Sequence, residues 1–180
     1  MRLFIGIPLA AQVVDALERI SRSLRSANDN LRWTSPETWH ITLQFLGETS
    51  IEKYRCVVQH LSEIKAPAVP VWLHGTGFFD RAGVFFAAVN VSPELRGLER
   101  LVVAATAQCG LNTEDRPYHP HVTLARAKGK ESVRALRKLK SQVKSDLEFP
   151  SFTAREFLLF ESFLGSNGAR HEVRDRFPLG

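Results

Sequence analysis

The strongest constraint on the fold is an internal repeat, because two similar stretches of the chain end in the same kind of four-residue motif. The first ends in His-Ile-Thr-Leu at residues 40–43, and the second ends in His-Val-Thr-Leu at residues 121–124, which is 81 residues later. A shift of the same length places Leu3-Phe4-Ile5 on Val84-Phe85-Phe86. Self-similarity at a fixed spacing indicates copies of one supersecondary unit that bury their apolar faces together.

Each copy predicts the same order of elements. An apolar strand comes first, at residues 3–9 in one copy and 84–91 in the other. A helix with amphipathic spacing follows, at about 10–27 and 93–109, and a loop then leads to a short strand that opens on the histidine. The C-terminal residues, about 155–178, predict a hairpin that turns at Gly-Ser-Asn-Gly.

Length and composition favour a soluble globular protein without a membrane anchor. The 180 residues are 44% hydrophobic, which suits a core in one domain or in two small lobes packed together. No apolar stretch approaches the roughly 20 residues that cross a bilayer. The apolar N-terminal stretch does not predict a signal peptide, because Gly6 and Pro8 interrupt it and a similar stretch recurs inside the chain.

The two cysteines predict the redox compartment. Cys56 and Cys109 stand 53 residues apart, and neither has a second cysteine or a metal-type spacing nearby. Isolated cysteines of this kind are typical of cytoplasmic proteins, where reducing agents keep thiols from pairing. We therefore predict two reduced thiols and a cytoplasmic location.

One segment makes the protein basic. The net charge is +5, and residues 128–144 hold seven Lys or Arg against one Glu, so this segment carries +6. Apolar residues recur there at steps of three and four, at Val133, Leu136, Leu139 and Val143. This spacing predicts an amphipathic helix with a cationic outer face. Two interpretations stay open, a solvated helix face or a surface that attracts a polyanion over long range.

The two histidine motifs predict a polar face on each strand. Side chains two residues apart in a strand project from the same face, so His40 and Thr42 point one way, as do His121 and Thr123. Histidine and threonine need hydrogen-bond partners when buried, which makes them poor packing material. If the copies are related by pseudo-twofold symmetry, the two polar faces meet across a cleft.

Two facing histidines suit the cleavage of a phosphodiester. Imidazole has an unperturbed pKa of about 6.5, so near neutrality one ring accepts a proton while the other donates one. An in-line displacement at phosphorus needs a base for the entering oxygen and an acid for the leaving oxygen. The threonine hydroxyls between them are suited to hold the non-bridging oxygens.

Four stretches, with the paired motifs inside two of them, together resemble a known family. They are "RLFIGIPL" at the start, "RWTSPETWHITLQFLGE" and "RPYHPHVTLARAK" around the two motifs, and "ESFL" near the end. The chain resembles the two-histidine (2H) phosphoesterases, in the branch of the LigT-like bacterial RNA 2′,3′-cyclic phosphodiesterases, formerly described as 2′-5′ RNA ligases. The resemblance runs essentially from end to end. One difference is the strand at residues 83–86, "GVFF", where many relatives carry a basic residue and a tryptophan.

The resemblance implies an α+β fold of two pseudo-symmetric lobes, with antiparallel sheets that line a central cleft and with helices outside. It implies a single domain over residues 1–180, built from two intertwined lobes with repeat units of about 1–48 and 82–129 and with the terminal hairpin at about 155–178. The implied substrate is RNA with a 2′,3′-cyclic phosphate end, or a small cyclic nucleotide, opened by water to a 2′-phosphate. No cofactor and no metal ion are implied, and we expect no membrane partner and a monomer.

The resemblance also implies roles for named residues. His40 is expected to protonate the departing 3′ oxygen, and His121 is expected to activate water. Thr42 and Thr123 are expected to bind the phosphate, together with Arg126. Strict strand alternation raises an objection, because it places Arg126 on the face away from His121, where a surface salt bridge is the alternative role.

Several aromatic and histidine side chains near the motifs have two interpretations each. The family position of Phe45 borders a nucleobase pocket, but alternation places this ring in the core, which is the interpretation we favour. Trp33, Trp39 and Tyr118 are candidates for stacking on a base or for simple packing. His119 and His121 share a face and have the spacing of metal ligands, with Glu114 and Asp115 nearby in sequence, but we expect His119 to flank the cleft.

Three functions therefore compete. The first is hydrolysis of RNA 2′,3′-cyclic phosphate. The second is the reverse chemistry, in which two RNA ends are joined through a 2′-5′ linkage. The third is a non-catalytic module that binds RNA ends through the basic helix, and this interpretation leaves the paired histidines unexplained.

Overall fold

The structure is a computed structural model of the whole chain. It describes residues 1–26, 30–111, 117–127, 132–143, 147–165 and 168–180, with the backbone alone at 132 and 133. The turn predicted for the hairpin therefore lies partly outside the described residues, as do the ends of the basic segment. No helix in the described ranges is long and apolar enough to cross a membrane.

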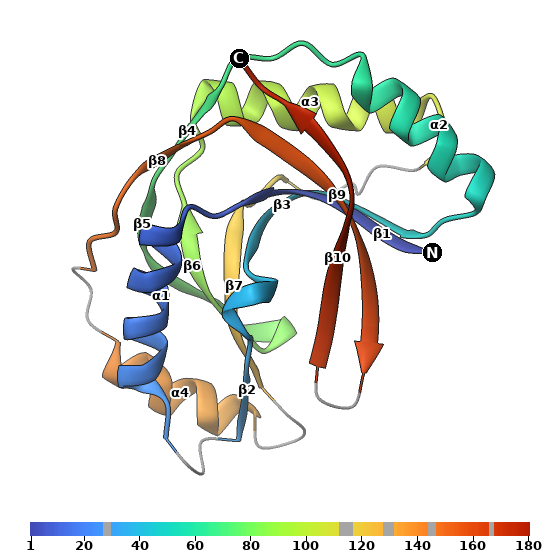
Figure 1. Cartoon of the computed structure of the whole chain (residues 1–180). Coiled ribbons are helices and arrows are strands. Elements are labelled where there is room, and N and C mark those ends of the chain that lie inside the picture. Colours follow the sequence, from blue (N-terminus) through green and yellow to red (C-terminus); the bar gives the residue numbers. More distant parts are fainter. Residues whose placement is uncertain (27–29, 112–116, 128–131, 144–146, 166–167) are drawn as a thin grey trace.

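Figure 1 shows the strands and helices of the described residues. In order they are β1 (Arg2–Pro8), α1 (Ala11–Leu24), β2 (Leu31–Trp33), η1 (Pro36–Thr38), β3 (His40–Glu48), α2 (Ile51–Ser62), β4 (Val69–Val71), β5 (Leu73–Phe79), η2 (Asp80–Ala82), β6 (Val84–Val89), α3 (Pro93–Ala107), β7 (His121–Ala127), α4 (Ser132–Gln142), β8 (Phe152–Ala154), β9 (Glu156–Gly165) and β10 (Gly168–Pro178). The helix starts at α2 and α3 follow from sequence, because the Ser50 and Ser92 hydroxyls accept backbone N–H groups of the first turns.

Two four-stranded antiparallel sheets form the fold. Their strand orders are β10-β9-β1-β3 and β2-β7-β6-β5, and a two-stranded ladder pairs β4 with β8. Each sheet thus contains one apolar strand next to one histidine strand. Short β2 comes from the N-terminal part of the chain but pairs with β7 of the second sheet. The prediction of an α+β fold with antiparallel sheets is confirmed.

The helices lie at two ends of the molecule. In Figure 1, α2 and α3 lie on one side, and α1 and α4 lie at the opposite end. α3 packs on β3, where the Thr106 hydroxyl donates a 2.7 Å hydrogen bond to the buried Gln44 side chain. α4 packs on β7 with Leu136 and Leu139 buried and with exposed basic residues outside, so the predicted amphipathic helix is confirmed within its described part.

The register of the sheets corrects the alignment of the first strands. Ile5 lies opposite Gln44 in one sheet, and Phe85 lies opposite Ala125 in the other. Gln44 and Ala125 are 81 residues apart, but Ile5 and Phe85 are 80 apart, so the predicted match of Ile5 with Phe86 is wrong by one residue. The sequence hid this because both strands are nearly all apolar, and a shift of one residue exchanges two faces that look alike.

The prediction of two reduced thiols is also wrong. Cys56 on α2 and Cys109, just after α3, form a disulfide with their Cα atoms 5.8 Å apart. The two helices pack against each other, which brings cysteines 53 residues apart in sequence into contact. Their spacing carried no sign of this, because the pairing depends on which helices meet in space.

Candidate active site

A cleft of about 810 Å³ brings the two histidine motifs together. Its described lining includes side chains from both sheets, and the four motif residues His40, Thr42, His121 and Thr123 are among them. The remaining charged or titratable lining residues are Arg2, Arg32, Arg126 and His171. Because no carboxylate is among these lining residues, the cleft attracts anions.

The two motif histidines are held in the same way. His40 Nδ1 lies 2.7 Å from the carbonyl oxygen of Thr38, and His121 Nδ1 lies 2.8 Å from the carbonyl oxygen of His119. A carbonyl only accepts, so Nδ1 carries the proton in both rings and Nε2 is the nitrogen left for a ligand. Each ring thus presents a nitrogen that accepts a proton when neutral and donates one when charged.

A β-bulge interrupts each histidine strand at the same place. Gly6 lies opposite Thr42 and Ile5 opposite Gln44, so Leu43 is an extra residue on β3. On β7, Leu124 is the equivalent extra residue, between the partners of Phe85 and Phe86. A bulge adds one residue and changes which face the following side chains take. Both strands therefore show two successive buried residues immediately after the threonine.

These bulges overturn two expectations from alternation. Phe45 was predicted to pack in the core, but its ring is 55% exposed and lines the cleft. Arg126, its equivalent 81 residues later, was placed by alternation on the face away from His121, but it also lines the cleft. Gln44 and Ala125 are buried instead. The extra leucine in each strand is the physical reason for both errors.

Aromatic rings surround His40 on the cleft face of its sheet. The ring centroids of Phe4 and Phe160 lie 4.5 Å and 5.8 Å from that of His40, and Phe4 and Phe160 belong to a small apolar cluster of their own. Burial is the main cause that lowers the pKa of His40 to about 4. The bond to Thr38 opposes it, and interactions with His171, His121 and Arg126 add to it. His40 is therefore neutral near pH 7 when the cleft holds no anion.

His121 has an equivalent aromatic setting on the other sheet. Phe79 and Phe86 lie with ring centroids 5.0 Å and 5.3 Å from that of His121. Burial also lowers the pKa of His121, and the positive charges of His119 and Arg126 act in the same direction. A neutral His121 is the protonation state that a general base requires.

The threonines are fixed from the opposite half of the chain. The Tyr118 hydroxyl donates a 3.2 Å hydrogen bond to the carbonyl of Thr42, and the Thr34 hydroxyl lies 2.7 Å from the carbonyl of Thr123. Trp39 Nε1 in turn donates to Thr34 Oγ1 at 2.8 Å. Tyr118 and Trp39 therefore hold the two motif strands in place, and Tyr118 is not among the cleft-lining residues.

His171 is a third cleft histidine that the sequence analysis did not identify. It lies on β10 opposite Ser162, and its ring centroid is 5.3 Å from that of His40 in an edge arrangement. Burial lowers its pKa as well. The available signal was weak, because His171 belongs to the predicted hairpin but stands outside both repeats. By contrast, His119 is exposed, contacts Phe79 and Phe86, and is absent from the cleft lining.

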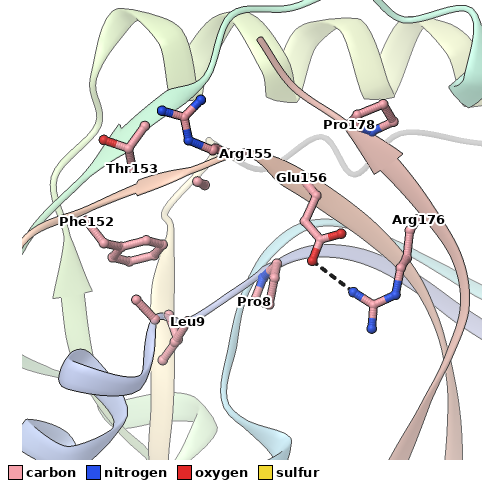
Figure 2. Close-up of a pocket in the computed structure, with 10 residues that line it drawn as sticks. Pro8, Leu9, Phe152, Thr153, Arg155, Glu156, Arg176 and Pro178 are labelled. Atoms are coloured by element: carbon pink, nitrogen blue, oxygen red, sulfur yellow. Dashed lines mark hydrogen bonds and ion pairs between the residues drawn. The ribbon is translucent and has the colours of Figure 1, made fainter.

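A second depression, of about 500 Å³, lies near the ends of β1, β8 and β10 (Figure 2). Pro8, Leu9 and Phe152 line it, and Glu156 and Arg176 close an ion pair of 2.8 Å across one side. Its lining residues include no histidine or cysteine, and its carboxylate, Glu156, is paired with Arg176.

Metal-type clusters in the described ranges lie away from the cleft. One group of three potential ligands has its atoms within 4.8 Å of one another, namely Cys56, His60 and Cys109, and both of its sulfurs are in the disulfide. The rings of His119 and His121 are 6.5 Å apart between centroids, and no third ligand joins them among the described residues. Glu114 and Asp115, considered as further ligands, lie outside the described residues.

Comparisons with known proteins agree with this arrangement. An RNA 2′,3′-cyclic phosphodiesterase of Aeropyrum pernix is 31% identical over 160 residues, which cover 87% of this chain and 90% of that protein. One from Thermus thermophilus is 30% identical over 190 residues, which cover 99% and 90%. The crystal structure of apo LigT from Escherichia coli superposes with a TM-score of 0.79 at 26% identity, over 99% of this chain and 96% of that one.

The model of the 2′-5′ RNA ligase superfamily matches residues 8–162, a stretch that includes both histidine motifs and most of the two sheets. Both the family match and the relatives extend over far more than half of the chain. The protein therefore belongs to the 2′-5′ RNA ligase superfamily, the two-histidine phosphoesterases.

Proposed function

We propose that this protein hydrolyses the 2′,3′-cyclic phosphate at RNA ends to a 2′-phosphate, without a metal ion. The observation that carries the proposal is the matched pair of cleft histidines, each with Nδ1 bonded to a backbone carbonyl and with Nε2 left for the substrate. The names of the relatives in Aeropyrum pernix and Thermus thermophilus support the same substrate. The described lining residues of the cleft include no carboxylate, which suits an anionic substrate.

The reaction divides between the two halves. Nε2 of His121 accepts a proton from water while the water oxygen attacks phosphorus. The bond from phosphorus to the 3′ oxygen breaks, and Nε2 of His40 gives its proton to that oxygen. The product carries a 2′-phosphate and a free 3′-hydroxyl, and exchange with solvent returns both rings to their starting states. The Thr42 and Thr123 hydroxyls donate to the non-bridging oxygens.

The low pKa of His40 fits this role when the substrate is present. A phosphodiester anion between the rings favours the charged imidazolium, so binding raises the pKa of His40 from about 4. An acid whose intrinsic pKa is low releases its proton readily to the leaving oxygen. The guanidinium of Arg126 neutralises the anion from its side of the cleft, and the exposed face of Phe45 is available to the terminal base.

The test is turnover of a short RNA that ends in 2′,3′-cyclic phosphate, with EDTA present and the product position identified by mass and by 2′ versus 3′ phosphate. We expect a 2′-phosphate product. Activity should fall more than a hundredfold in His40→Asn and in His121→Asn, which is roughly the rate enhancement that one proton transfer provides. Asparagine keeps a donor for the backbone carbonyl, so these variants isolate Nε2. His74→Ala, exposed on β5 and outside the cleft, is the control.

Three outcomes would contradict the proposal. Activity that depends on added zinc would reject the metal-free mechanism, and equal activity in wild type and His→Asn variants would reject the assigned pair. RNA binding without turnover would favour the RNA-end binding module. We further propose a monomer, which light scattering tests, and a cytoplasmic location, which fractionation of cells tests.

A further inference from the structure

Two arginines face the cleft from neighbouring strands. Arg32 on β2 and Arg126 on β7 are directly opposite in the antiparallel ladder, so their side chains project from the same face. Both line the cleft. Among the described residues, neither forms an ion pair with an Asp or Glu.

Such a pair is unfavourable unless an anion lies between or beside its members. Like charges directly opposite in a sheet destabilise it, and both arginine side chains are accessible to a ligand in the cleft. Arg32 lies between buried Leu31 and Trp33, which fix the strand on either side of it. The sheet therefore holds two cations close together at one end of the cleft.

The two arginines stand at different distances from the reacting phosphorus. Arg126 is five residues beyond His121, which is roughly 16 Å of extended strand, but its charge lowers the pKa of both motif histidines, so it belongs with the reacting phosphate. β2 lies a further 4.8 Å or so outward at the sheet edge. Arg32, on this edge strand, is placed for a second anion farther along the substrate.

We propose that Arg32 binds the internucleotide phosphate that precedes the terminal nucleoside of the RNA, next to Arg126, which faces the reacting phosphate. This inference rests on the proposed function, and it names the substrate class as oligoribonucleotides of at least two nucleotides, which the site prefers over a nucleoside cyclic phosphate. A planar guanidinium binds phosphate oxygens through two parallel N–H bonds, and a mononucleotide offers Arg32 no phosphate to bind.

The experiment compares kcat/KM for adenosine 2′,3′-cyclic phosphate with that for the dinucleotide ApA ending in 2′,3′-cyclic phosphate. We expect the wild type to prefer the dinucleotide at least tenfold and Arg32→Ala to reduce that ratio at least fivefold. With a neutral methylphosphonate linkage, the dinucleotide should no longer be preferred over the mononucleotide by the wild type. Arg32→Ala should not lower kcat/KM for this neutral dinucleotide any further. For the charged dinucleotide, the slope of log kcat/KM against log salt concentration should be less steep by about 0.7 in Arg32→Ala.

Arg19→Ala is the matched control, because Arg19 is an exposed arginine on α1 outside the cleft lining. Arg19→Ala removes the same charge and should leave the ratio of kcat/KM between the dinucleotide and the mononucleotide unchanged. A ratio that stays the same in Arg32→Ala, or that falls equally in Arg19→Ala, overturns the inference while the proposed function stands. If neither substrate is turned over by the wild type, the proposed function itself fails.

Discussion

The buried position of His40 makes folding stability depend on pH in a way that one substitution can isolate. Its pKa is about 4 in the folded protein against 6.5 for an exposed histidine. Between these values the unfolded chain binds a proton that the folded protein does not, so the free energy of unfolding falls as pH falls. The slope is about 1.4 kcal/mol per pH unit, which accumulates to about 3 kcal/mol by pH 4.

His40→Asn removes this titration and keeps a donor for the carbonyl of Thr38. When pH is lowered from 8 to 4, the free energy of unfolding of the wild type should fall by about 3 kcal/mol more than that of His40→Asn. This change does not depend on how the stabilities of the two proteins differ at pH 8. Urea unfolding followed by circular dichroism at each pH measures the two free energies. Thr42→Ala, which removes a cleft side chain but no titratable group, should run parallel to the wild type.

The comparison has a clear refuting result. If the difference between wild type and His40→Asn changes by less than about 1 kcal/mol from pH 8 to pH 4, the imidazole is hydrated in the folded protein. The packing of Phe4 and Phe160 on the ring would then not exclude water, and the argument that an anion must enter the cleft before His40 is protonated would fall with it.

Four further predictions concern the site and the disulfide. Burial lowers the pKa of both motif histidines, so the singly protonated pair is most populated below pH 6.5, and kcat/KM should peak there; a peak above pH 7.5 contradicts this. His171→Asn removes a positive charge that lowers the pKa of His40 and should move the peak to higher pH, whereas an unchanged profile argues against contact between these rings. Gly6→Ala would place a Cβ 2.8 Å from the carbonyl oxygen of Ile41 and 3.4 Å from a His40 ring carbon, so kcat should fall at least tenfold, and an unaffected kcat would show that the ring shifts freely. Reduction of the disulfide frees a 53-residue loop and should cost about 4 kcal/mol of stability, measured by urea unfolding with and without dithiothreitol, and equal midpoints would refute it.

The histidine and threonine of each motif could be placed from sequence because their arrangement depends only on short-range geometry. Within three residues of a strand, alternation holds, so His40 with Thr42 and His121 with Thr123 were correctly placed on one face each. The repeat then indicated that the two faces belong to equivalent strands. Both inferences need no knowledge of how the lobes pack.

What the sequence could not reveal depends on packing between distant segments. The Cys56–Cys109 disulfide forms because α2 and α3 lie together, and His171 meets His40 because β10 reaches the cleft through the terminal hairpin. Arg32 reaches the site because β2 joins the second sheet. None of these arrangements leaves a spacing pattern, since each joins elements whose separation in sequence is arbitrary.

The bulges explain why the two halves share a scaffold but differ in chemistry. Leu43 and Leu124 each add one residue, so the side chain five positions after the histidine turns to the cleft in both strands. That position holds Phe45 in one half and Arg126 in the other. One wall therefore offers an apolar ring and the other a cation. For the substrate of the proposed function, we expect the base to contact Phe45 and the phosphate to contact Arg126. The difference between the walls would then orient the substrate in a cleft whose catalytic pair is nearly symmetric.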